Sequence, residues 1–484
     1  MALPRDDRMS SSPRSQSPTL SSTRLEALRQ QIYGRILVPG DEGYDVARQT
    51  WNATTFEQHP ALVVMPRRAT DVAAAVDFAR ASELSIAVQA GGHGDPRPAD
   101  GALLINFADM AALRIVPSST GDGGTAHIEA GARWSEVIAA AARHGLATLN
   151  GFAGTVGVVG YTLGGGIGWL VRQYGAAAGS VQAAQVVTSD ARLLQVSEHD
   201  HSDLFWALRG GGGNVGIVTA LEFTLHPVRE VFGGFIAYPL AQGREALTVY
   251  AEWTKGVPET LTSAVRLIHY PPVPSLPGPL RGQSAVVIMV CYNGNASDGE
   301  ALVQPLRSVG LPLLDTFRPM AYAETATIAH DSTEAPPVFT ASDGGGLRDL
   351  SADVIENLLR IAGDRAAGIF LVETRHLGGA LARQPHASMP FGFRSPWFIS
   401  ALAAAPKRED LQIGKRTIDT LLQAWAPALT GERLINAVDA GRTGPHVTRA
   451  AYAPETYRRL VALQDKYDRH NVFRFDHNID PSGR

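Results

Sequence analysis

The chain has 484 residues, of which 45% are hydrophobic and 19% charged, a composition typical of globular proteins. This length exceeds what one hydrophobic core usually serves, so we expect two domains. The net charge of −4 and the lack of a basic run argue against a nucleic-acid partner. A single cysteine, Cys291, excludes an internal disulfide and any cysteine-based metal site.

The first 24 residues differ from the rest in composition. They are rich in Ser, Pro and Arg and contain no apolar core. This composition predicts a disordered tail over residues 1–24, and it fits neither a secretory signal nor a membrane anchor. Without a targeting segment we expect a cytoplasmic protein with no membrane partner. Helical spacing that starts at Leu25 predicts the beginning of the ordered chain.

Short strands and helices alternate up to Val228. We expect strands over residues 61–65, 86–89, 103–107, 114–117, 126–130, 184–188, 193–196 and 217–225. We expect helices over residues 70–82, 134–144 and 203–208. Thr70 is the predicted cap of the first of these helices.

Beyond Val228 the predicted elements become longer. Strands are expected over residues 233–239, 264–270, 285–292, 368–376 and 397–402, and helices over 244–254, 298–309, 352–362 and 411–425. Such a set predicts an open antiparallel sheet with helices on one face. This second domain should span residues 229–440. The last segment, 441–484, should hold a helix followed by a returning strand or loop.

One glycine-dense stretch, residues 151–168, reads GFAGTVGVVGYTLGGGIG. Dense glycine in apolar surroundings indicates buried backbone that bends sharply or approaches something closely. A buried strand with bulges is the alternative, but it does not need three consecutive glycines at Gly164 to Gly166. A loop whose backbone N–H groups face a phosphate-bearing cofactor fits the stretch better.

Two other motifs resemble binding sites, but their sequence context argues against that function. Residues 211–216, GGGNVG, match the GxGxxG fingerprint of nicotinamide dinucleotide sites. Here a helix precedes and a strand follows, the inverse of the required order, so we reject that site. Residues 198–203, EHDHSD, suggest a metal cluster. A polar loop that caps the next helix through Ser202 or Asp203 explains them better, and we expect no metal.

Two sets of polar side chains are candidates for catalysis or ligand binding. His93 follows a predicted strand and lies between glycines, which leave its ring open to a large ligand, and a neutral imidazole is a nucleophile. Glu373 and Arg375 share one face of a predicted strand end. They form either a solvated end, an internal ion pair or part of a cleft between domains.

Taken together, the ordered motifs resemble a known family. They are Gly91-Gly92-His93, Val156-Gly157 with Gly164 to Gly166, the segments 203–206, 209–213 and 216–219, and residues 471–473 with Asn478-Ile479. This order is similar to the FAD-linked oxidases, above all the berberine-bridge-enzyme-like branch of the vanillyl-alcohol-oxidase (p-cresol methylhydroxylase, PCMH) superfamily. The resemblance implies an α+β fold. A PCMH-type FAD-binding domain would span 25–228, with its core at 56–228, beside a substrate domain whose antiparallel sheet is covered by helices.

The resemblance also implies a cofactor site. His93 would carry a bond to the flavin 8α-methyl, and Ala153 stands where doubly attached members have cysteine, so His93 would be the only link. Gln89 and Tyr161 depart from the residues most frequent at their positions. The implied FAD-binding residues are Gly91, Gly92, His93, Gly94, Gly154, Thr155, Val156, Gly157, Gly160, Tyr161, Gly164, Gly166, Gly216, Val218 and Asn478.

The implied reaction moves a hydride to flavin N5 from an alcohol, hemiacetal or activated C–H of a small substrate such as a sugar or secondary metabolite. A base must take the proton. Tyr452 is the first candidate and Glu373 the second, with Arg375 lowering the pKa of either. Val156 matches a position that admits oxygen when it is small, which favours an oxidase that releases hydrogen peroxide. A dehydrogenase with another acceptor, and a flavin-binding protein without turnover, stay open.

Overall fold

The computed structural model describes residues 20–94, 97–334, 337–385, 387–438, 445–475 and 477–480. Most of the predicted tail, residues 1–19, lies outside this range, as do residues 439–444, 476 and 481–484 near the C-terminus. The first helix, α1 (Ser22–Gln31), begins three residues before Leu25. The Ser21 side chain accepts the Arg24 N–H, so an N-cap defines this start better than the apolar spacing does.

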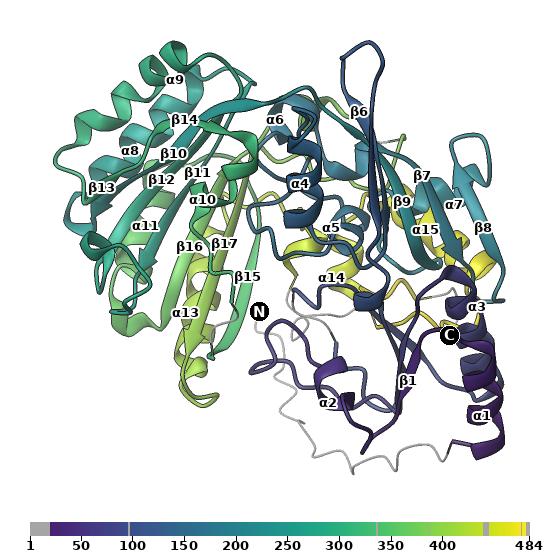
Figure 1. Cartoon of the computed structure of the whole chain (residues 1–484). Coiled ribbons are helices and arrows are strands. Elements are labelled where there is room, and N and C mark those ends of the chain that lie inside the picture. Colours follow the sequence, from purple (N-terminus) through teal and green to yellow (C-terminus); the bar gives the residue numbers. More distant parts are fainter. Residues whose placement is uncertain are drawn as a thin grey trace.

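Two sheets form in the first half of the chain (Figure 1). The four-stranded sheet has the order β1 (Arg35–Leu37), β2 (Leu62–Met65), β4 (Leu103–Asn106), β3 (Ile86–Gln89). Its β2–β4 and β3–β4 pairs are parallel. The five-stranded sheet is antiparallel, in the order β5 (Leu113–Pro117), β6 (Gly124–Glu129), β9 (Ile217–Leu225), β7 (Val181–Val187), β8 (Leu193–Ser197).

Helices connect and cover these sheets. They are α2 (Tyr44–Ala47), α3 (Ala69–Ala81), α4 (Trp134–Ala142), α5 (Val158–Leu163), α6 (Val171–Tyr174) and α7 (Ser202–Leu208). The predicted Thr70 cap is wrong, because α3 starts at Ala69 and Arg68 is its N-cap residue. The predicted cap at Ser202 or Asp203 is also wrong, because His201 is the N-cap of α7. Asp71, fully buried in the first turn of α3, accepts the N–H groups of Gly34 and Arg67 and so anchors the start of the helix.

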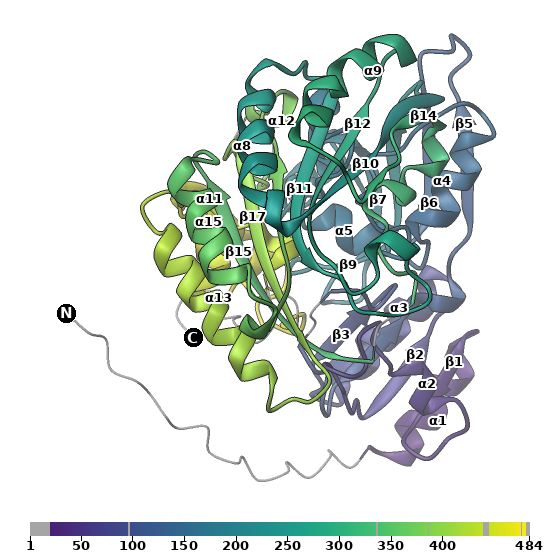
Figure 2. The same cartoon turned by 90° about the vertical axis from the view of Figure 1, so that its left-hand side faces the viewer.

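An eight-stranded antiparallel sheet dominates the second half. Its main order is β13 (Leu314–Asp315), β10 (Glu230–Pro239), β12 (Ser284–Tyr292), β11 (Leu261–His269), β16 (Ile369–His376), β17 (Trp397–Ala405), β15 (Phe339–Leu347), and β14 (Arg318–Ala321) also pairs with β10. The helices of this half are α8 (Gly243–Trp253), α9 (Ala296–Val303), α10 (Ala326–Ala329), α11 (Ala352–Ala362), α12 (Ala380–Arg383) and α13 (Leu411–Trp425). Figures 1 and 2 show α8, α11 and α13 together on one face of the sheet. The predicted α+β fold with a helix-covered antiparallel sheet is therefore confirmed.

Strand β15 is not among the strands expected from the sequence, and it contains three consecutive glycines, which are unusual inside a strand. The structure explains them by close approach to neighbouring chain. A Cβ at Gly344 would lie 2.1 Å from the Ile399 carbonyl oxygen, and one at Gly346 would lie 2.2 Å from Ser395 Oγ. Glycine is required here by packing against β17 and its flanks, which the local sequence does not reveal.

The end of the chain returns to the first half of the molecule. Two helices, α14 (Pro445–Ala450) and α15 (Pro454–Tyr467), precede this last segment, and α15 packs against α7. The following loop is joined to β3 by a hydrogen bond from the Ile86 N–H to the Val472 carbonyl. Further on, the Ile479 N–H donates to Asn214 Oδ1 over 3.0 Å. The predicted return of the segment to the first domain takes the form of a loop.

Candidate active site

A cavity of about 540 Å³ lies between the glycine-rich loops and the eight-stranded sheet. On one side, its lining residues come from within the segments 86–94, 151–167 and 212–218. Arg375 of β16 and Phe398 and Ser400 of β17 line it from the sheet. The segments 434–438 and 473–477 contribute further lining residues. Thus widely separated parts of the chain form one cavity, large enough for an extended ligand.

Two glycine loops touch at the cavity wall. A Cβ placed on Gly91 would lie 3.0 Å from the Gly157 backbone nitrogen, and one on Gly157 would lie 3.0 Å from that of Gly91. Gly92 and Gly94 have φ angles of 64° and 94°, in the region that side chains rarely adopt. The glycines therefore allow close backbone contact and tight turns beside the cavity, as expected from the density of glycine in the sequence.

Most of the predicted cofactor residues line this cavity. They are Gly91, Gly92, His93, Gly94, Val156, Gly157, Gly160, Tyr161, Gly164, Gly216 and Val218. Gly154, Thr155, Gly166 and Asn478 are not among its lining residues. Thr155 and Asn478 are nevertheless the chain neighbours of Val156 and His477, which both line it. Gly166 lies behind the Tyr161 ring, where an added Cβ would come within 2.4 Å of it.

Buried polar atoms without a partner gather around the cavity. Within the described part of the chain, Thr155 Oγ1, the Tyr161 hydroxyl, His477 Nδ1 and Asn478 Oδ1 have no hydrogen-bond partner. Each such atom costs roughly 1–3 kcal/mol when it stays unpaired in the protein interior. A ligand with phosphate, hydroxyl and ring nitrogen and oxygen atoms offers them partners. The glycine loops and these polar atoms thus fit an extended nucleotide cofactor such as FAD.

His93 is held in a defined orientation at the cavity. Its ring stacks on the Trp51 ring, with centroids 4.3 Å apart and planes 24° apart. The Gly94 N–H donates to His93 Nδ1 over 3.1 Å, so Nδ1 carries a lone pair. Burial lowers the pKa of His93 to about 4, against an opposing effect of Asp331, so the ring is neutral near pH 7. A neutral, oriented imidazole is a competent nucleophile.

Arg375 enters the cavity from β16 as part of a buried ion-pair network. Its Nε donates to Glu373 Oε1 over 2.5 Å, and Arg266 Nε donates to Glu373 Oε2 over 2.6 Å. Arg266 also donates to Asp331 Oδ1 over 2.8 Å. The Arg375 guanidinium lies over the Phe152 ring, 4.1 Å from its centroid. These contacts fix a cation at the cavity wall.

The same network makes Glu373 a poor proton acceptor. Burial raises the pKa of its carboxyl, but Arg266 and Arg375 outweigh burial and bring that pKa down to about 2. Both carboxylate oxygens are already bonded to guanidinium groups. Glu373 is also not among the residues that line the cavity. Of the alternatives open for this strand end, the geometry therefore favours an internal ion pair for Glu373 and a cavity-facing role for Arg375.

Tyr452, the first candidate for the base, is placed elsewhere. It belongs to the hydrophobic core around the first two sheets, and it is not among the cavity-lining residues. Its hydroxyl donates to the Gly210 carbonyl over 3.0 Å. At this position the phenol packs in the core and is not among the cavity-lining residues, so the assignment of Tyr452 as the base stays a prediction.

Several cavity residues were not predicted from the sequence. Asp331 is the one carboxylate among the described lining residues, and its side chain is 32% exposed. It lies in a loop after α10 that carries no motif. Phe152 and His477 adjoin predicted positions, whereas Phe398 lies in a predicted strand whose facing side could not be assigned. For Asp331 no local signal exists, since only the tertiary fold brings it to the cavity.

Within the described ranges, no group of three or more His, Cys, Asp or Glu side chains is arranged to hold a metal ion. No helix in the same part of the chain has the length and apolar character needed to cross a membrane.

Comparison with known proteins agrees with this geometry. A family model described as an FAD binding domain matches residues 60–197, and one described as berberine and berberine like matches residues 435–480. The chain is 27% identical to (R)-6-hydroxynicotine oxidase of Paenarthrobacter nicotinovorans over 469 residues, 93% of this chain and 98% of that protein.

Solved structures share the whole fold. The structure of 6-hydroxy-D-nicotine oxidase from Arthrobacter nicotinovorans superposes with a TM-score of 0.79 at 25% identity, over 93% of this chain and 98% of that one. Glucooligosaccharide oxidase from Acremonium strictum, whose FAD is 6-S-cysteinyl and 8α-N1-histidyl, superposes with a TM-score of 0.79 at 21% identity, over 95% and 100%.

These matches, together with the cavity, define a flavoprotein with a PCMH-type FAD-binding fold. Within that class the chain is an FAD-linked oxidoreductase, and its segment 435–480 matches the berberine and berberine like family model.

Proposed function

We propose that this oxidoreductase is an oxidase, which takes a hydride from an alcohol, hemiacetal or activated C–H of a small organic substrate such as a sugar or secondary metabolite. The observation that carries the proposal is the shared cavity, in which glycine loops suited to FAD face Arg375 and Asp331 of the other half of the chain. FAD bound there supplies two-electron acceptance, and its reoxidation by molecular oxygen releases hydrogen peroxide.

We infer that His93 is the only covalent attachment site. Its neutral ring lines the cavity between Gly92 and Gly94. Ala153 also lines the cavity and has no group that can form a bond to FAD. Cys291 is fully buried in β12 and is not among the lining residues, and burial raises the pKa of its thiol, so it is unsuited to attack. A histidyl bond is also described for the FAD of one protein with the same fold.

Two charged side chains have distinct proposed tasks. Asp331 accepts the proton of the substrate hydroxyl, because it is the carboxylate that the described cavity wall presents. Arg375, fixed by Glu373 and Phe152, stabilises negative charge that develops on the substrate oxygen. The Tyr161 hydroxyl is buried at the cavity, and burial raises its pKa, so it is suited to donate a hydrogen bond rather than to accept a proton.

Anaerobic titration with a panel of alcohols, sugars and phenolic metabolites tests the proposed reaction. At least one compound should bleach the flavin absorbance, and readmitted oxygen should restore the colour with one hydrogen peroxide formed per flavin. Bleaching that only an artificial acceptor reverses would identify a dehydrogenase. A flavin that no compound in the panel bleaches would favour a binding protein without turnover.

The attachment site is tested by intact mass under denaturing conditions. The native protein should carry the mass of FAD, and His93→Ala should have the bare polypeptide mass while it still binds FAD through the backbone loops. A native protein at the bare polypeptide mass would rule out the histidyl link and leave the reaction to be judged by bleaching alone.

A further inference from the structure

The back of the His93 ring is covered by a residue outside the cavity. Trp51 stacks on His93, but it is not among the residues that line the cavity. The Trp51 N–H also donates to the Gly92 carbonyl over 2.7 Å, so the two chain segments are joined by backbone as well as by side chain. His93 therefore has one face against an indole and its edge toward the space that suits FAD.

Trp51 belongs to a loop, residues 49–58, that is fixed to the strand leading to His93. Gln58 Nε2 donates to Gln89 Oε1 over 2.9 Å and to the Arg48 carbonyl over 2.6 Å. In return Gln89 Nε2 donates to the Gln49 carbonyl over 2.8 Å. Because Gln89 is the last residue of β3, these bonds set the distance between the loop and the histidine.

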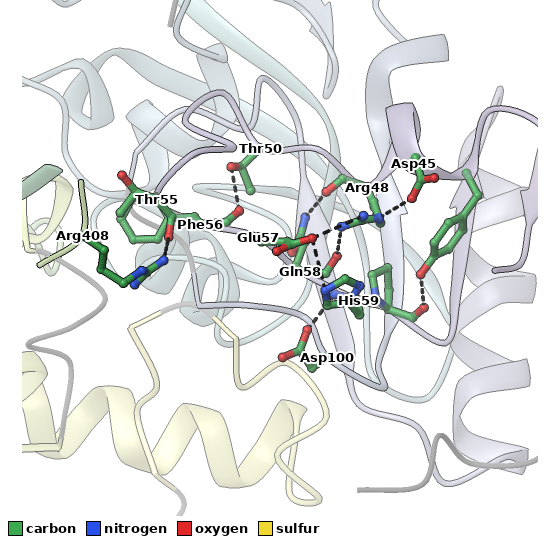
Figure 3. Close-up of polar contacts among 12 residues, drawn as sticks. Asp45, Arg48, Thr50, Thr55, Phe56, Glu57, Gln58, His59, Asp100 and Arg408 are labelled. Atoms are coloured by element: carbon green, nitrogen blue, oxygen red, sulfur yellow. Dashed lines mark hydrogen bonds and ion pairs between the residues drawn. The ribbon is translucent and has the colours of Figure 1, made fainter. Parts of the chain in front are cut away.

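The same loop is fixed to the opposite half of the molecule. Asn52 Nδ2 donates to Thr340 Oγ1 of β15 over 2.8 Å, and the Thr340 N–H donates to Thr55 Oγ1 over 3.0 Å. Figure 3 shows the Arg408 side chain reaching the Thr55 carbonyl from that side, over 3.4 Å. Inside the loop, Thr50 Oγ1 donates to the Phe56 carbonyl over 3.1 Å. The loop that carries Trp51 is thus held from both sides, and its backbone cannot move away from His93 without breaking several hydrogen bonds.

We propose that Trp51 is a positioning residue for the attachment of FAD to His93. The proposal rests on the proposed histidyl link. Stacking holds the imidazole in one rotamer, and the indole keeps water from one face, so that the ring edge at the cavity keeps a fixed orientation. Once the bond has formed, the imidazole can carry a positive charge, which the indole face stabilises.

Attachment of the imidazole to the flavin is a two-electron oxidation. One C–H of the flavin 8α-methyl and the imidazole N–H are lost, and one C–N bond forms. The two protons and two electrons released reduce molecular oxygen, the acceptor already proposed for the enzyme, to hydrogen peroxide. Trp51 takes no part in these bonds, and its effect is on the rate at which the oriented, uncharged ring attacks.

Four variants separate stacking from general support of the loop. Trp51→Phe keeps an aromatic face, Trp51→Leu keeps apolar bulk without one, and Trp51→Ala removes both. Thr50→Ala is the matched control, because it breaks a hydrogen bond inside the loop and leaves the stacked pair intact. Each protein is analysed for covalent FAD by denaturing mass, for total FAD by absorbance, and for the flavin midpoint potential.

The native protein, Trp51→Phe and Thr50→Ala should be largely covalent. Trp51→Leu and Trp51→Ala should still contain FAD, but attachment on addition of FAD should be at least about fivefold slower, or about 1 kcal/mol in activation free energy. Their noncovalent fraction should have a lower midpoint potential than the attached form. Equal attachment rates in Trp51→Leu and the native protein would overturn the role of Trp51, as would an equal loss in Thr50→Ala. A native protein without covalent FAD would overturn the link itself.

Discussion

At the scale of single residues, the charge of each side chain in the cavity follows from its immediate partners. Glu373 is held ionised by two guanidinium groups and so cannot take up a proton near neutral pH. Asp331 shares only Arg266 with that network and remains partly exposed at the cavity. Two carboxylates on one network therefore differ in their surroundings: Glu373 orients the Arg375 cation, and Asp331 faces the cavity, where it is the proposed base.

Asp331→Asn tests this division. The amide keeps the shape of the side chain but cannot accept the substrate proton, so reduction of the flavin should be slowed roughly 100-fold or more. Stopped-flow absorbance under anaerobic conditions measures this rate, and the melting temperature reports on folding.

The control for this variant is Tyr452→Phe. Its lost hydrogen bond to Gly210 should cost roughly 1 kcal/mol of stability, while the reduction rate should change by no more than about twofold. If Asp331→Asn reduced at the native rate, or if Tyr452→Phe were the slow variant, the assignment of the base would be wrong.

At the scale of elements, the glycine stretch, residues 151–168, contains one short helix, α5, which lies against the cavity. Gly160 lies inside α5 and lines the cavity, and a Cβ built on it meets no protein atom within 4 Å. Gly168, a few residues later, is different, because its Cβ would lie 1.7 Å from the Asn150 carbonyl oxygen. One glycine leaves room for a ligand and the other leaves room for the backbone.

Gly160→Ala should therefore fold and yet hold less FAD. Alanine is preferred to glycine in a helix by about 1 kcal/mol, so the secondary structure should be preserved. The added methyl group occupies space at the cavity wall, so the ratio of FAD to protein should fall. Gly256→Ala, also with nothing within 4 Å of the new Cβ but outside the cavity, should keep full FAD. Full loading of Gly160→Ala would show that this wall does not contact FAD.

The elements themselves could largely be predicted from the sequence, because periodicity and glycine density are local signals. Strands β11, β12 and β16 and helices α8, α11 and α13 lie within a few residues of their expected ranges. The tertiary placement of residues far apart in the sequence could not be predicted. Asp331 has no pattern around it, the three glycines of β15 resemble a loop, and the place of Tyr452 in the core depends on how α15 packs on α7.

At the scale of the whole molecule, several histidines are buried in the uncharged form. Burial lowers the pKa of His226 to about 4 and that of His376 to about 3. In the unfolded chain a histidine takes up its proton near pH 6.5. Between these values the unfolded state binds more protons, so the free energy of unfolding falls as the pH drops from about 7 to 4. Asp468, whose pKa burial raises to about 6, acts in the opposite direction.

The melting temperature should therefore fall steadily between pH 7 and pH 4.5. His226→Phe tests the cause, since the ring can still stack on Tyr174, 3.8 Å away between centroids, but cannot be charged. We expect this variant to recover roughly 1–3 kcal/mol of the loss at the acid end. Thermal unfolding followed by circular dichroism at several pH values measures it. If the melting temperatures of the native protein and His226→Phe fell in parallel with pH, His226 would be excluded as a cause of acid sensitivity.

The cavity combines Gln58 near one end of the chain with His477 near the other, and the segment beyond residue 470 is tied to Ile86 and Asn214. On the ribosome, the early glycine loops emerge long before the residues that close the cavity. At 5–20 residues per second, synthesis up to His477 takes on the order of a minute. The cofactor can therefore be enclosed only after translation is nearly finished, and a nascent chain halted before residue 470 should emerge without flavin.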